Sequence, residues 1–389
     1  MHRLFCFSHI LILSTLLICQ NSEASSGTTL VDNWSAFEEK LDSLRKEKRI
    51  PGLAVAVVSD GKVVGATGFG FADSNNEIPV TPNTPFWIAS ISKTFVGLAY
   101  LQLEAQGKVN FDEVAAKTPK FTGLCEWLAG TDIAFAERLD CSSNITIQNI
   151  LNHQVNGVPG TEFMYNPIMY SRLSRHLEHK LGEGVDEVEG RHNFLGQWIE
   201  QSILRPAGMN RTMASMWDRN KMEVYFDLAD GFAVDENGNK TKLRRPDKHI
   251  AGGAGVVSTV LDLAKYEAAI NTGSIASSKV LERVLKPETF NDGRTSPYGY
   301  GWYFQCHRTE KLMWHGGWDP DAGYSGLLLR LPERDLAVAI LANSGGMWWG
   351  NPLDKSQVES SEFASLFLDE FVFTDNYESP DSQCQEGAL

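Results

Sequence analysis

Hydrophobic positions recur with two different spacings in the first part of the chain. Residues 34–48 repeat apolar side chains every three or four positions, which predicts an amphipathic helix that Pro51 ends. Residues 53–60 and 62–73 are runs rich in Val and Ala, a composition typical of strands. They are joined by Asp60-Gly61, a dipeptide typical of tight hairpin turns. The pattern predicts a helix followed by a β-hairpin.

The middle of the chain favours helices. A helical pattern runs over residues 90–106, and Gly107 stops it. Residues 108–250 are mixed, helix-leaning and rich in loops, and residues 259–271 form a further amphipathic helix pattern. The long middle segment therefore predicts a mainly helical part of the molecule.

The C-terminal third returns to strands. The strand-like runs are KLMWHG at 311–316, GYSGLLLRL at 323–331 and LAVAILAN at 336–343. A turn at 332–335 joins the last two, and a final helix is expected at about 357–371. Strands at both ends with helices between them describe an α+β protein, in which one antiparallel sheet holds the N- and C-terminal strands and helices cover it. That arrangement brings Ser90 near His315.

Composition and charge narrow the class of protein. The 389 residues are 42% hydrophobic, which is ample for a large core in one big domain or two ordinary ones. The net charge of -14 would repel a phosphate backbone, and no basic cluster stands out against it. We therefore expect no nucleic-acid partner.

The N-terminus is typical of an export signal. Arg3 gives a short basic start, residues 4–18 are an apolar run, and Ser22 and Ala24 are small residues that suit signal peptidase. The run is too short for a comfortable membrane span, so we expect a signal peptide over residues 1–24 and a secreted or periplasmic protein. Lipidation at Cys19 is the alternative, although Ile18 stands where such signals need a small side chain.

Four of the six cysteines lie outside the predicted signal: Cys125, Cys141, Cys306 and Cys384. In an oxidising compartment an even number suggests disulfides. The spacing suggests one bridge from Cys125 to Cys141, closing a short loop, and one from Cys306 to Cys384, tying down the C-terminal tail. Four cysteines allow three connectivities, and four free thiols are the alternative.

Ser90-Ile91-Ser92-Lys93 offers a nucleophile and a base. A serine hydroxyl is a weak nucleophile unless a base removes its proton. On a helix, positions i and i+3 share one face, so the amine of Lys93 can reach Ser90, and the helix N-terminus adds positive potential. Apolar neighbours such as Phe86 and Phe95 could lower the pKa of Lys93. In the alternative interpretation Ser90 caps the helix and Lys93 points to solvent.

The Ser-x-x-Lys pattern is too short to decide between these alternatives. Ser43-Leu44-Arg45-Lys46 is a second match, in a stretch so charged that it predicts a solvated helix face. The surroundings of each match must decide.

Downstream of Ser90, several motifs follow in order. They are ILNHQVNGVPGTEFMYNP, RPAGMNRT, AGGAGVVSTVLDLAKY, YGYGW and WHGGWDPDAGYSG. With them the chain resembles the penicillin-recognising serine hydrolases, in the class C β-lactamase-related branch that also holds esterases, D-aminopeptidases and D,D-peptidases. The resemblance implies a β-lactamase/transpeptidase-like fold, an acyl-enzyme mechanism on a small-molecule or peptide substrate, and no metal or other cofactor. It also implies a catalytic domain over residues 30–375, with a helical lobe at about 108–250 and a polar tail at 376–389.

The resemblance also assigns roles within the site. Ser90 would be the nucleophile, Lys93 its activating partner, and Tyr165 the tyrosine of the Tyr-x-Asn motif, which relays protons. The substrate-binding residues would be His315, Gly316 and Gly317, where related β-lactamases have Lys-Thr-Gly. The backbone N–H groups of Ser90 and Trp318 would form the oxyanion hole.

Three departures from the family pattern bear on the substrate. Tyr165-Asn166-Pro167 lacks the third side chain that usually hydrogen-bonds the substrate amide, which puts amide and β-lactam recognition in doubt. A neutral imidazole at His315 is a weaker carboxylate anchor than lysine, and residues 153–157 are one residue longer than the usual His-Thr-Ser-Gly. Tyr170 is the alternative motif tyrosine, but the preceding Pro-Gly-Thr-Glu-Phe fits Tyr165 better.

Other chemistries are less well supported. His176 and His179 lie i and i+3 on a predicted helix, but the charged residues around them favour a solvated face over a metal site. We interpret His153 as a structural hydrogen-bonding residue. No Gly-x-Ser-x-Gly elbow occurs, which argues against an α/β-hydrolase.

We therefore expect an exported serine hydrolase that cleaves a small ester or amide through an acyl-Ser90 intermediate. A true β-lactamase or D,D-carboxypeptidase is the nearest alternative. A catalytically silent relative that only binds ligands is the other. Retention of Ser90, Lys93, Tyr165 and His315 together favours activity.

Overall fold

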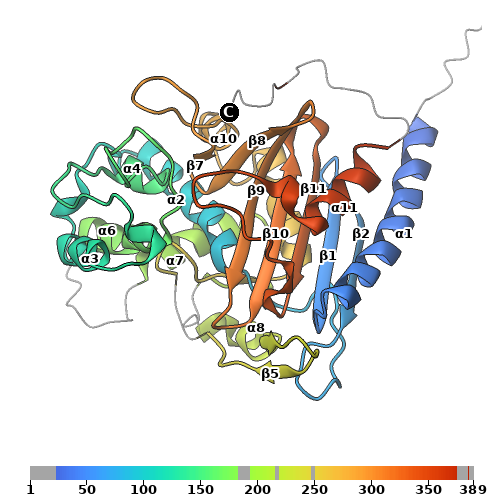
Figure 1. Ribbon diagram of the computed structural model, residues 1–389. Coiled ribbons are helices and arrows are strands. Elements are labelled where there is room, and N and C mark those ends of the chain that lie inside the picture. The colour runs from blue at the N-terminus through green and yellow to red at the C-terminus, as the bar shows by residue number, and fades with distance from the viewer. Residues whose placement is uncertain (1–22, 183–192, 215–218, 247–249, 375–383, 385–389) are drawn as a thin grey trace, which may run out of the picture.

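A computed structural model describes residues 23–182, 193–214, 219–246, 250–374 and Cys384. Its centre is a seven-stranded antiparallel sheet with helices on both faces, and a helical part lies on one side (Figure 1). In spatial order the strands are β2 (Lys62–Gly70), β1 (Gly52–Ser59), β11 (Leu336–Ala342), β10 (Tyr324–Leu331), β9 (Glu310–Asp319), β8 (Trp302–His307) and β7 (Tyr298–Gly299). The predicted α+β class and the shared sheet of N- and C-terminal strands are confirmed.

The pairing of β1 with β11 joins the two ends of the chain. Leu53 lies opposite Ala342, and the register continues without interruption to Ser59 opposite Leu336. The predicted hairpin of β1 and β2 also forms, with a register shift at Val57 and Val58. Because β11 lies between β1 and β10, the sheet cannot be completed until the last third of the chain is present.

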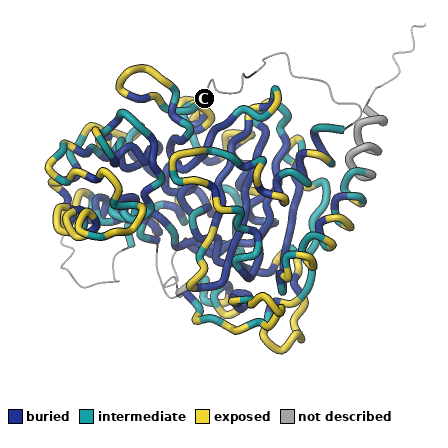
Figure 2. The backbone as a smooth tube through the Cα atoms, in the orientation of Figure 1, coloured by how far each residue is buried: buried dark blue, intermediate teal, exposed yellow. Residues whose placement is uncertain are grey.

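Both faces of the sheet are buried, which explains the nearly continuous apolar sequence of β1. Alternate residues of a strand point to opposite faces. Ala54, Ala56 and Val58 belong to one apolar core, and Leu53, Val55 and Val57 to the other. Figure 2 shows the sheet buried along its strands, with exposed segments mainly in peripheral loops.

Each face of the sheet has its own helices. α1 (Glu23–Glu47) and α11 (Glu362–Phe371) pack together on one face (Figure 1). Phe37 of α1 contacts Phe367 and Phe371 of α11 edge-on, with ring centroids 6.2 and 5.4 Å apart. The opposite core contains α2 (Ser92–Ala105) and α9 (Val260–Thr272), and α9 lies against β1 and β11.

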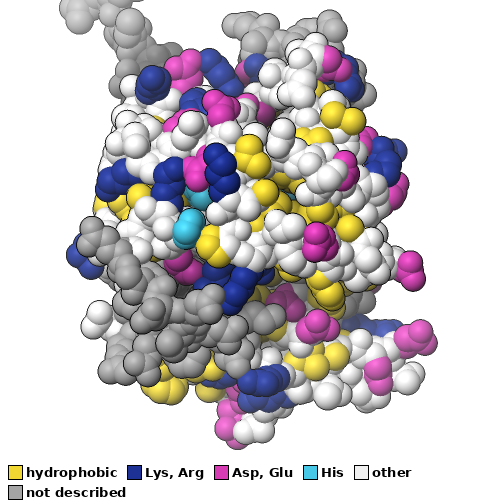
Figure 3. Space-filling model, turned by 90° about the vertical axis from the view of Figure 1, so that its left-hand side faces the viewer, with side chains coloured by type: hydrophobic (Ala, Val, Ile, Leu, Met, Phe, Trp, Pro, Cys, Tyr) yellow, Lys and Arg dark blue, Asp and Glu magenta, His cyan; other side chains and the backbone are white. Residues whose placement is uncertain are grey.

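The segment predicted as a helical lobe contains short helices and a small hairpin. The helices are α3 (Phe121–Ala129), α4 (Ile147–Leu151), α5 (Pro167–Tyr170), α6 (Arg172–Leu181), α7 (Phe194–Ile199) and α8 (Met222–Phe226). The hairpin of β4 (Phe232–Val234) and β5 (Lys240–Lys242) was not predicted, and the lobe boundaries remain a prediction. Viewed from this side, the molecule carries both basic and acidic side chains, and hydrophobic side chains gather in a band near the middle (Figure 3).

Several predicted boundaries need correction. α1 begins at Glu23 rather than at residue 34, and β2 ends at Gly70 because the chain then turns away. The strand expected at 311–316 extends over Glu310–Asp319, and the pairing of β7 with β8 was missed. The predicted signal peptide lies outside the described residues except for Glu23 and Ala24. The same holds for the tail, except for Cys384.

The two disulfides have the predicted connectivity. Cys125 pairs with Cys141 across the loop that follows α3, with an S–S distance of 2.04 Å. Cys306 on β8 pairs with Cys384, and their Cα atoms are 5.7 Å apart. Two disulfides are typical of a protein outside the reducing cytosol. Within the described part of the chain, no helix is both long and apolar enough to cross a membrane.

A close backbone contact holds α2 against the turn between β7 and β8. A Cβ atom added at Gly97 would lie 1.8 Å from the carbonyl oxygen of Tyr300. One added at Gly301, which has φ of +92°, would lie 2.1 Å from the carbonyl oxygen of Lys93. Two glycines therefore allow the helix of the proposed nucleophile to touch the sheet directly.

We expect Gly97→Ala to lower the free energy of unfolding by about 1–3 kcal/mol, because the added methyl group overlaps the backbone of Tyr300. The measurement is urea unfolding followed by circular dichroism. Gly123→Ala in α3 is the matched control, since its new Cβ would meet open space. The control should stabilise the protein by roughly 0.5–1 kcal/mol through helix propensity. Equal effects of the two substitutions would contradict the close contact.

Candidate active site

Ser90 lies in a single turn that leads directly into α2. The turn is the 3₁₀ helix η1 (Ala89–Ile91), and Lys93 is the second residue of α2. Ala89 has φ of +44°, a strained value for a residue with a side chain. That strain immediately precedes Ser90 and marks the position as one that the surrounding structure holds in place.

A short two-stranded sheet holds the segment before Ser90. It pairs β3 (Phe86–Trp87) with β6 (Val257–Ser258). The N–H of Ile88 donates to the carbonyl of Val256, and the N–H of Val256 donates to the Oγ of the buried Ser92 at 3.1 Å. Ser92 therefore has a structural role, and Ser90 is the serine of this motif that remains half-buried at the surface of the site.

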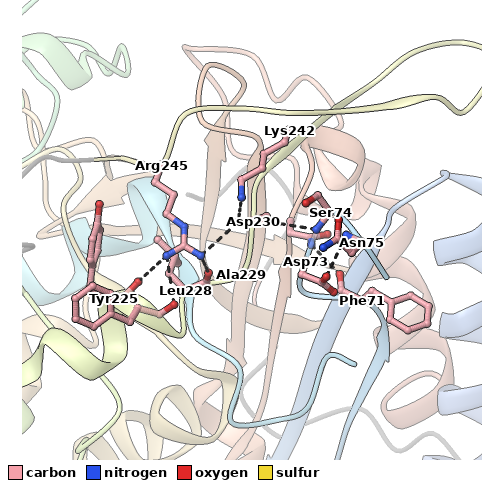
Figure 4. Close-up of polar contacts among 12 residues, drawn as sticks. Phe71, Asp73, Ser74, Asn75, Tyr225, Leu228, Ala229, Asp230, Lys242 and Arg245 are labelled. Atoms are coloured by element: carbon pink, nitrogen blue, oxygen red, sulfur yellow. Dashed lines mark hydrogen bonds and ion pairs between the residues drawn. The ribbon is translucent and has the colours of Figure 1, made fainter. Parts of the chain in front are cut away.

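Asp230 fastens the loop that carries the chain into β3 (Figure 4). Its buried carboxylate accepts a hydrogen bond from the N–H of Ser74 at 3.2 Å, and pairs with Lys242 at 2.8 Å and Arg245 at 3.3 Å. The next residue back, Ala229, donates from its N–H to the carbonyl of Pro85. Residues 229–245 thus hold the segment that precedes β3 and leads to Ser90.

Lys93 is completely buried, and its amine contacts the candidate nucleophile. Nζ lies 2.9 Å from the Oγ of Ser90 and 2.7 Å from the carbonyl oxygen of Gly253. Lys93 forms no ion pair with any of the described residues. Burial holds the pKa of Lys93 well below its usual value of 10.5, because the charged ammonium would be desolvated. The contacts exclude the alternative in which Lys93 points to solvent.

Two tyrosine rings line the amine on its other sides. Nζ of Lys93 lies 4.9 Å from the ring centre of Tyr165 and 5.5 Å from that of Tyr170. Burial raises the pKa of Tyr165, and the nearby Ser90 hydroxyl offsets part of that rise. The Tyr165 hydroxyl makes no regular hydrogen bond to the residues that the structure describes. Tyr165 is thus a neutral phenol placed beside Ser90 and Lys93.

His153 supports the segment that carries Tyr165. Its Nδ1 accepts a hydrogen bond from the N–H of Asn166 at 2.9 Å, and its ring centre lies 4.4 Å from that of Tyr165. Burial is the main cause that lowers the pKa of His153, so the ring is neutral. The predicted structural hydrogen bond of His153 is confirmed.

The amide of Asn166 is used inside the protein. Its Oδ1 accepts from the N–H of Met169 and so caps α5, while its Nδ2 donates to Asn156 and to the carbonyl of Phe135. Pro167, which replaces the third residue of the expected motif, is the first residue of α5. Proline suits that position because its φ is already helical and no N–H is required there. The departure from Tyr-x-Asn is thus built into the local fold.

His315 lies in the wall of the site with both ring nitrogens occupied. Its Nδ1 donates to the carbonyl of Gly316 at 2.7 Å, and its Nε2 accepts from the hydroxyl of Tyr298 at 3.1 Å. The side chain is 1% exposed, and burial lowers its pKa well below the usual value. Because the imidazole is neutral and both ring nitrogens are hydrogen-bonded within the protein, neither nitrogen is left for a substrate carboxylate.

Gly317, two residues after His315, allows a close contact between β9 and the turn of Ser90. A Cβ at Gly317 would lie 2.4 Å from the carbonyl oxygen of Ile88, so η1 rests directly on β9. The pairing of β8 with β9 ends at Trp314, whereas the pairing of β9 with β10 continues to Asp319. Residues 315–319 therefore form an edge of the sheet that faces the turn of Ser90, with Trp318 in it.

Sequence reasoning assigned no role to Gly253, Tyr298 or Asp230. Gly253 and Tyr298 lie in the quoted motifs AGGAG and YGYGW, but a backbone acceptor or a wall tyrosine has no pattern of its own. The partners of Asp230 are spread from Ser74 to Arg245, so no local signal indicates the cluster.

The solvated face predicted for His176 is wrong. Only His179 is exposed; His176 is buried, with Nδ1 3.0 Å from the hydroxyl of Tyr100 and Nε2 3.6 Å from Glu113. The charged neighbours misled the prediction because the buried partners are distant in sequence. Across the described ranges, no group of three or more His, Cys, Asp or Glu side chains is arranged to hold a metal.

The second Ser-x-x-Lys match is a surface feature. Ser43 lies on the exposed face of α1, and its Oγ donates to the carbonyl of Glu39 at 3.0 Å. Lys46 pairs with Asp42. The predicted solvated face is confirmed there.

Residues 37–355 match the protein-family model described as Beta-lactamase. The chain belongs to the β-lactamase family. Most of the described sheet and the complete site of Ser90, Lys93, Tyr165 and His315 fall within the matched residues. The family assignment agrees with the resemblance and establishes a β-lactamase/transpeptidase-like fold.

Individual relatives of this β-lactamase-family protein are distant. A D-aminopeptidase of Brucella anthropi is 28% identical over 300 residues, covering 73% of this chain and 54% of the relative. The chain thus spans about half the length of that relative. An octameric penicillin-binding protein homologue from Pyrococcus abyssi has a TM-score of 0.63 at 24% identity, covering 90% of this chain and 79% of the other. A class C β-lactamase from Rhodobacter sphaeroides has a TM-score of 0.60 at 18% identity, with coverage of 85% and 96%. These structures show the fold alone.

We expect Lys93→Met to raise the free energy of unfolding at neutral pH by about 1–2 kcal/mol, because the substitution removes a buried amine whose charged form is desolvated. Lys93 has a pKa below 10.5 in the folded protein. Between that lowered pKa and pH 10.5, the unfolded chain therefore binds more protons than the folded protein. The wild type therefore gains stability as pH rises, and the advantage of the variant shrinks toward pH 10.5.

Urea unfolding at several pH values between 6 and 10 measures this difference. Lys279→Met is the control, since Lys279 is exposed on α10 (Ser278–Val284). The control should change little at any pH. A Lys93→Met variant that is less stable than the wild type at every pH would show that the amine stabilises the fold.

Proposed function

We propose that this chain is an exported serine hydrolase that cleaves a small ester or amide through an acyl-Ser90 intermediate. The catalytic domain comprises residues 30–375. The observation that carries the proposal is the buried amine of Lys93, 2.9 Å from the Oγ of Ser90. A structural lysine in a core would be paired with a carboxylate, whereas this one contacts a hydroxyl and a carbonyl.

The contacts of Lys93 suit a general base. A neutral amine has two hydrogens and one lone pair. Its hydrogen bond to the carbonyl of Gly253 uses one hydrogen and orients the group, so that the lone pair can face the hydroxyl of Ser90. The lowered pKa makes this neutral form accessible at a lower pH than for an exposed lysine.

In the first step, the Oγ of Ser90 attacks the substrate carbonyl carbon and its proton passes to Lys93. The backbone N–H groups of Ser90 and Trp318 stabilise the negative oxygen that results. The bond to the leaving group then breaks, and the leaving group takes the proton of the Tyr165 hydroxyl, which Lys93 replaces. The raised pKa of Tyr165 supports this role, because the residue is a neutral proton donor.

In the second step, water attacks the acyl-Ser90 carbonyl. Tyr165 and Lys93 together accept the water proton, and Ser90 leaves with a proton from the same pair. Because the two groups exchange one proton, their titration belongs to the pair rather than to either residue.

The walls of the site favour a substrate without a carboxylate beside the scissile bond. His315 is neutral, and both of its nitrogens are bonded. Asn166 is turned inward and Pro167 has no donor. These features support an esterase or peptidase type over a true β-lactamase or D,D-carboxypeptidase. The D-aminopeptidase relative supports an amide substrate as the second candidate.

Export rests on the N-terminal sequence and the disulfides. Residues 1–24 have the basic start, apolar run and small residues of a signal peptide. The bridges of Cys125 with Cys141 and Cys306 with Cys384 require oxidising conditions to persist. A secreted or periplasmic location accounts for both.

Intact-mass analysis after exposure to a fluorophosphonate tests the nucleophile. We expect one adduct on the mature wild-type protein, an adduct on Ser43→Ala, and none on Ser90→Ala. Ser43→Ala is the matched control because Ser43 is the serine of the other Ser-x-x-Lys match. Labelling of Ser90→Ala at the wild-type rate would refute Ser90 as the nucleophile.

Exposure to a penicillin in parallel separates the alternatives. We expect no stable penicillin adduct and no loss of the intact penicillin from solution. A penicillin adduct on Ser90 or turnover of the penicillin would establish the β-lactamase or D,D-peptidase alternative instead. Failure of both reagents to label Ser90 would favour the silent binding relative.

The rate of fluorophosphonate labelling should rise with pH. The reactive form has neutral Lys93, and the fraction of that form grows as pH increases through the lowered pKa of the amine. The midpoint should lie well below 10.5. A rate that is independent of pH between 5 and 10 would contradict Lys93 as the base.

A further inference from the structure

Three tryptophans form a wall beside the proposed oxyanion hole. This tryptophan wall consists of Trp318 at the end of β9 and Trp348 and Trp349 in the loop that follows β11. The rings of Trp318 and Trp348 are stacked, with centroids 5.4 Å apart and an interplanar angle of 11°. The centroids of Trp348 and Trp349 are 4.9 Å apart, at 41°. Together they present a continuous aromatic surface.

The inner end of the wall is anchored and its outer end is not. The indole N–H of Trp349 donates to the carbonyl of Gln357 at 3.1 Å, and the ring packs on Trp314 at 5.4 Å. Trp318 is 43% exposed, and neither its N–H nor that of Trp348 has a hydrogen-bond partner among the residues described. The outer rings therefore keep aromatic surface that the fold itself does not use.

The wall is positioned by the same strand that forms the site. Gly316 has no side chain, and rings of Trp349 and Trp348 fill the space at 3.2 and 3.4 Å from where its Cβ would be. The neighbouring Gly317 rests on Ile88, two residues before Ser90. The Trp318 side chain is attached to the residue whose N–H is proposed to hold the oxyanion. A substrate held by that N–H must pass close to the indole.

The ring contacts continue from the wall to Tyr165. Trp314 stacks on Tyr303 with centroids 4.1 Å apart at 7°, and Tyr303 stacks on Tyr165 at 5.9 Å and 23°. Displacement of the wall would therefore be transmitted to the proposed proton donor through packed rings. Packed rings thus connect the wall with Tyr165.

The charges near the wall disfavour an anionic ligand. His315 is neutral. Asp319 follows Trp318, and its carboxylate accepts from the indole N–H of Trp87 at 3.1 Å. Among the described residues, no lysine or arginine makes a cation–π contact with the rings of the wall. Flat apolar rings without a cation over them suit an uncharged aromatic group.

We propose that Trp318 and Trp348 bind an uncharged aromatic ring of the substrate next to the scissile bond, so that the enzyme prefers aromatic esters or amides to small aliphatic ones. This inference rests on the proposed function and names its substrate class. Stacking on one indole adds to the transition-state affinity for the aromatic substrate and adds nothing for a methyl group.

Three esters test the preference. Ethyl acetate is the reference, ethyl phenylacetate places the ring on the acyl side, and benzyl acetate places it on the alcohol side. We expect the wild-type kcat/KM for at least one aromatic ester to exceed that for ethyl acetate. In Trp348→Ala that ratio should fall about 3- to 10-fold, as expected for the loss of one aromatic contact. Trp348→Phe should restore most of it.

Trp127→Ala is the matched control, since Trp127 on α3 is 57% exposed and lies in the helical part of the molecule. Its ratio should equal that of the wild type. An equal loss for all three esters in Trp348→Ala, or an unchanged ratio, would overturn the proposal. The ester that shows the effect places the ring on the acyl or the alcohol side.

A binding measurement separates this inference from the proposed function. Saturation-transfer NMR on Ser90→Ala compares phenylacetamide with acetamide, and needs no catalysis. We expect signal transfer to the phenyl protons, weakened in Ser90→Ala/Trp348→Ala and unchanged in Ser90→Ala/Trp127→Ala. If the wild type hydrolyses no ester but this pattern is seen, the wall is supported and the proposed hydrolysis fails. Equal transfer in all three proteins would overturn the proposal that the wall binds the aromatic ring.

Discussion

The burial of one amine is the constraint on which the site depends. Lys93 lies at the start of α2 with no exposed surface, and water cannot solvate its charge there. The fold has to supply the hydrogen-bond partners that water would otherwise provide. It does so with one carbonyl at Gly253, one hydroxyl at Ser90 and the faces of two tyrosine rings. None of these groups carries a full negative charge, so the environment tolerates the amine without fixing it as an ammonium.

Meeting that constraint requires parts of the chain that are far apart in sequence. Gly253 follows the helical segment, Tyr165 lies within it, and β9 comes from the C-terminal third. Strand β11 lies between β1 and β10 and joins them, and Gly97 allows α2 to contact the β7–β8 turn without an intervening side chain. The burial of the amine thus depends on contacts from many parts of the fold. Such an arrangement is expected where a functional group lowers the stability of the protein.

The parts of this arrangement that the sequence could predict are the local ones. Ser90 and Lys93 are three residues apart, so helix geometry alone brings them together. The apolar runs of β1, β10 and β11 are long enough to show their strands. β8 was missed because its polar and aromatic residues owe their burial to distant partners: Gln305, for example, bonds to the indole of Trp314 and the N–H of Val358. His176 failed for the same reason, since Tyr100 and Glu113 lie outside its own helix. Nothing in a local pattern records which distant residue will satisfy a polar atom.

The short β8 has a consequence for how the protein avoids other copies of itself. Because the pairing of β8 with β9 ends at Trp314, residues 315–319 of β9 are a free strand edge, and free edges invite another chain to add a strand. In this fold the turn of Ser90 packs directly against this part of β9, with the carbonyl of Ile88 close to Gly317. The turn that carries Ser90 therefore also protects this strand edge from pairing with another chain. The proposed substrate site coincides with the part of the sheet that most needs such protection.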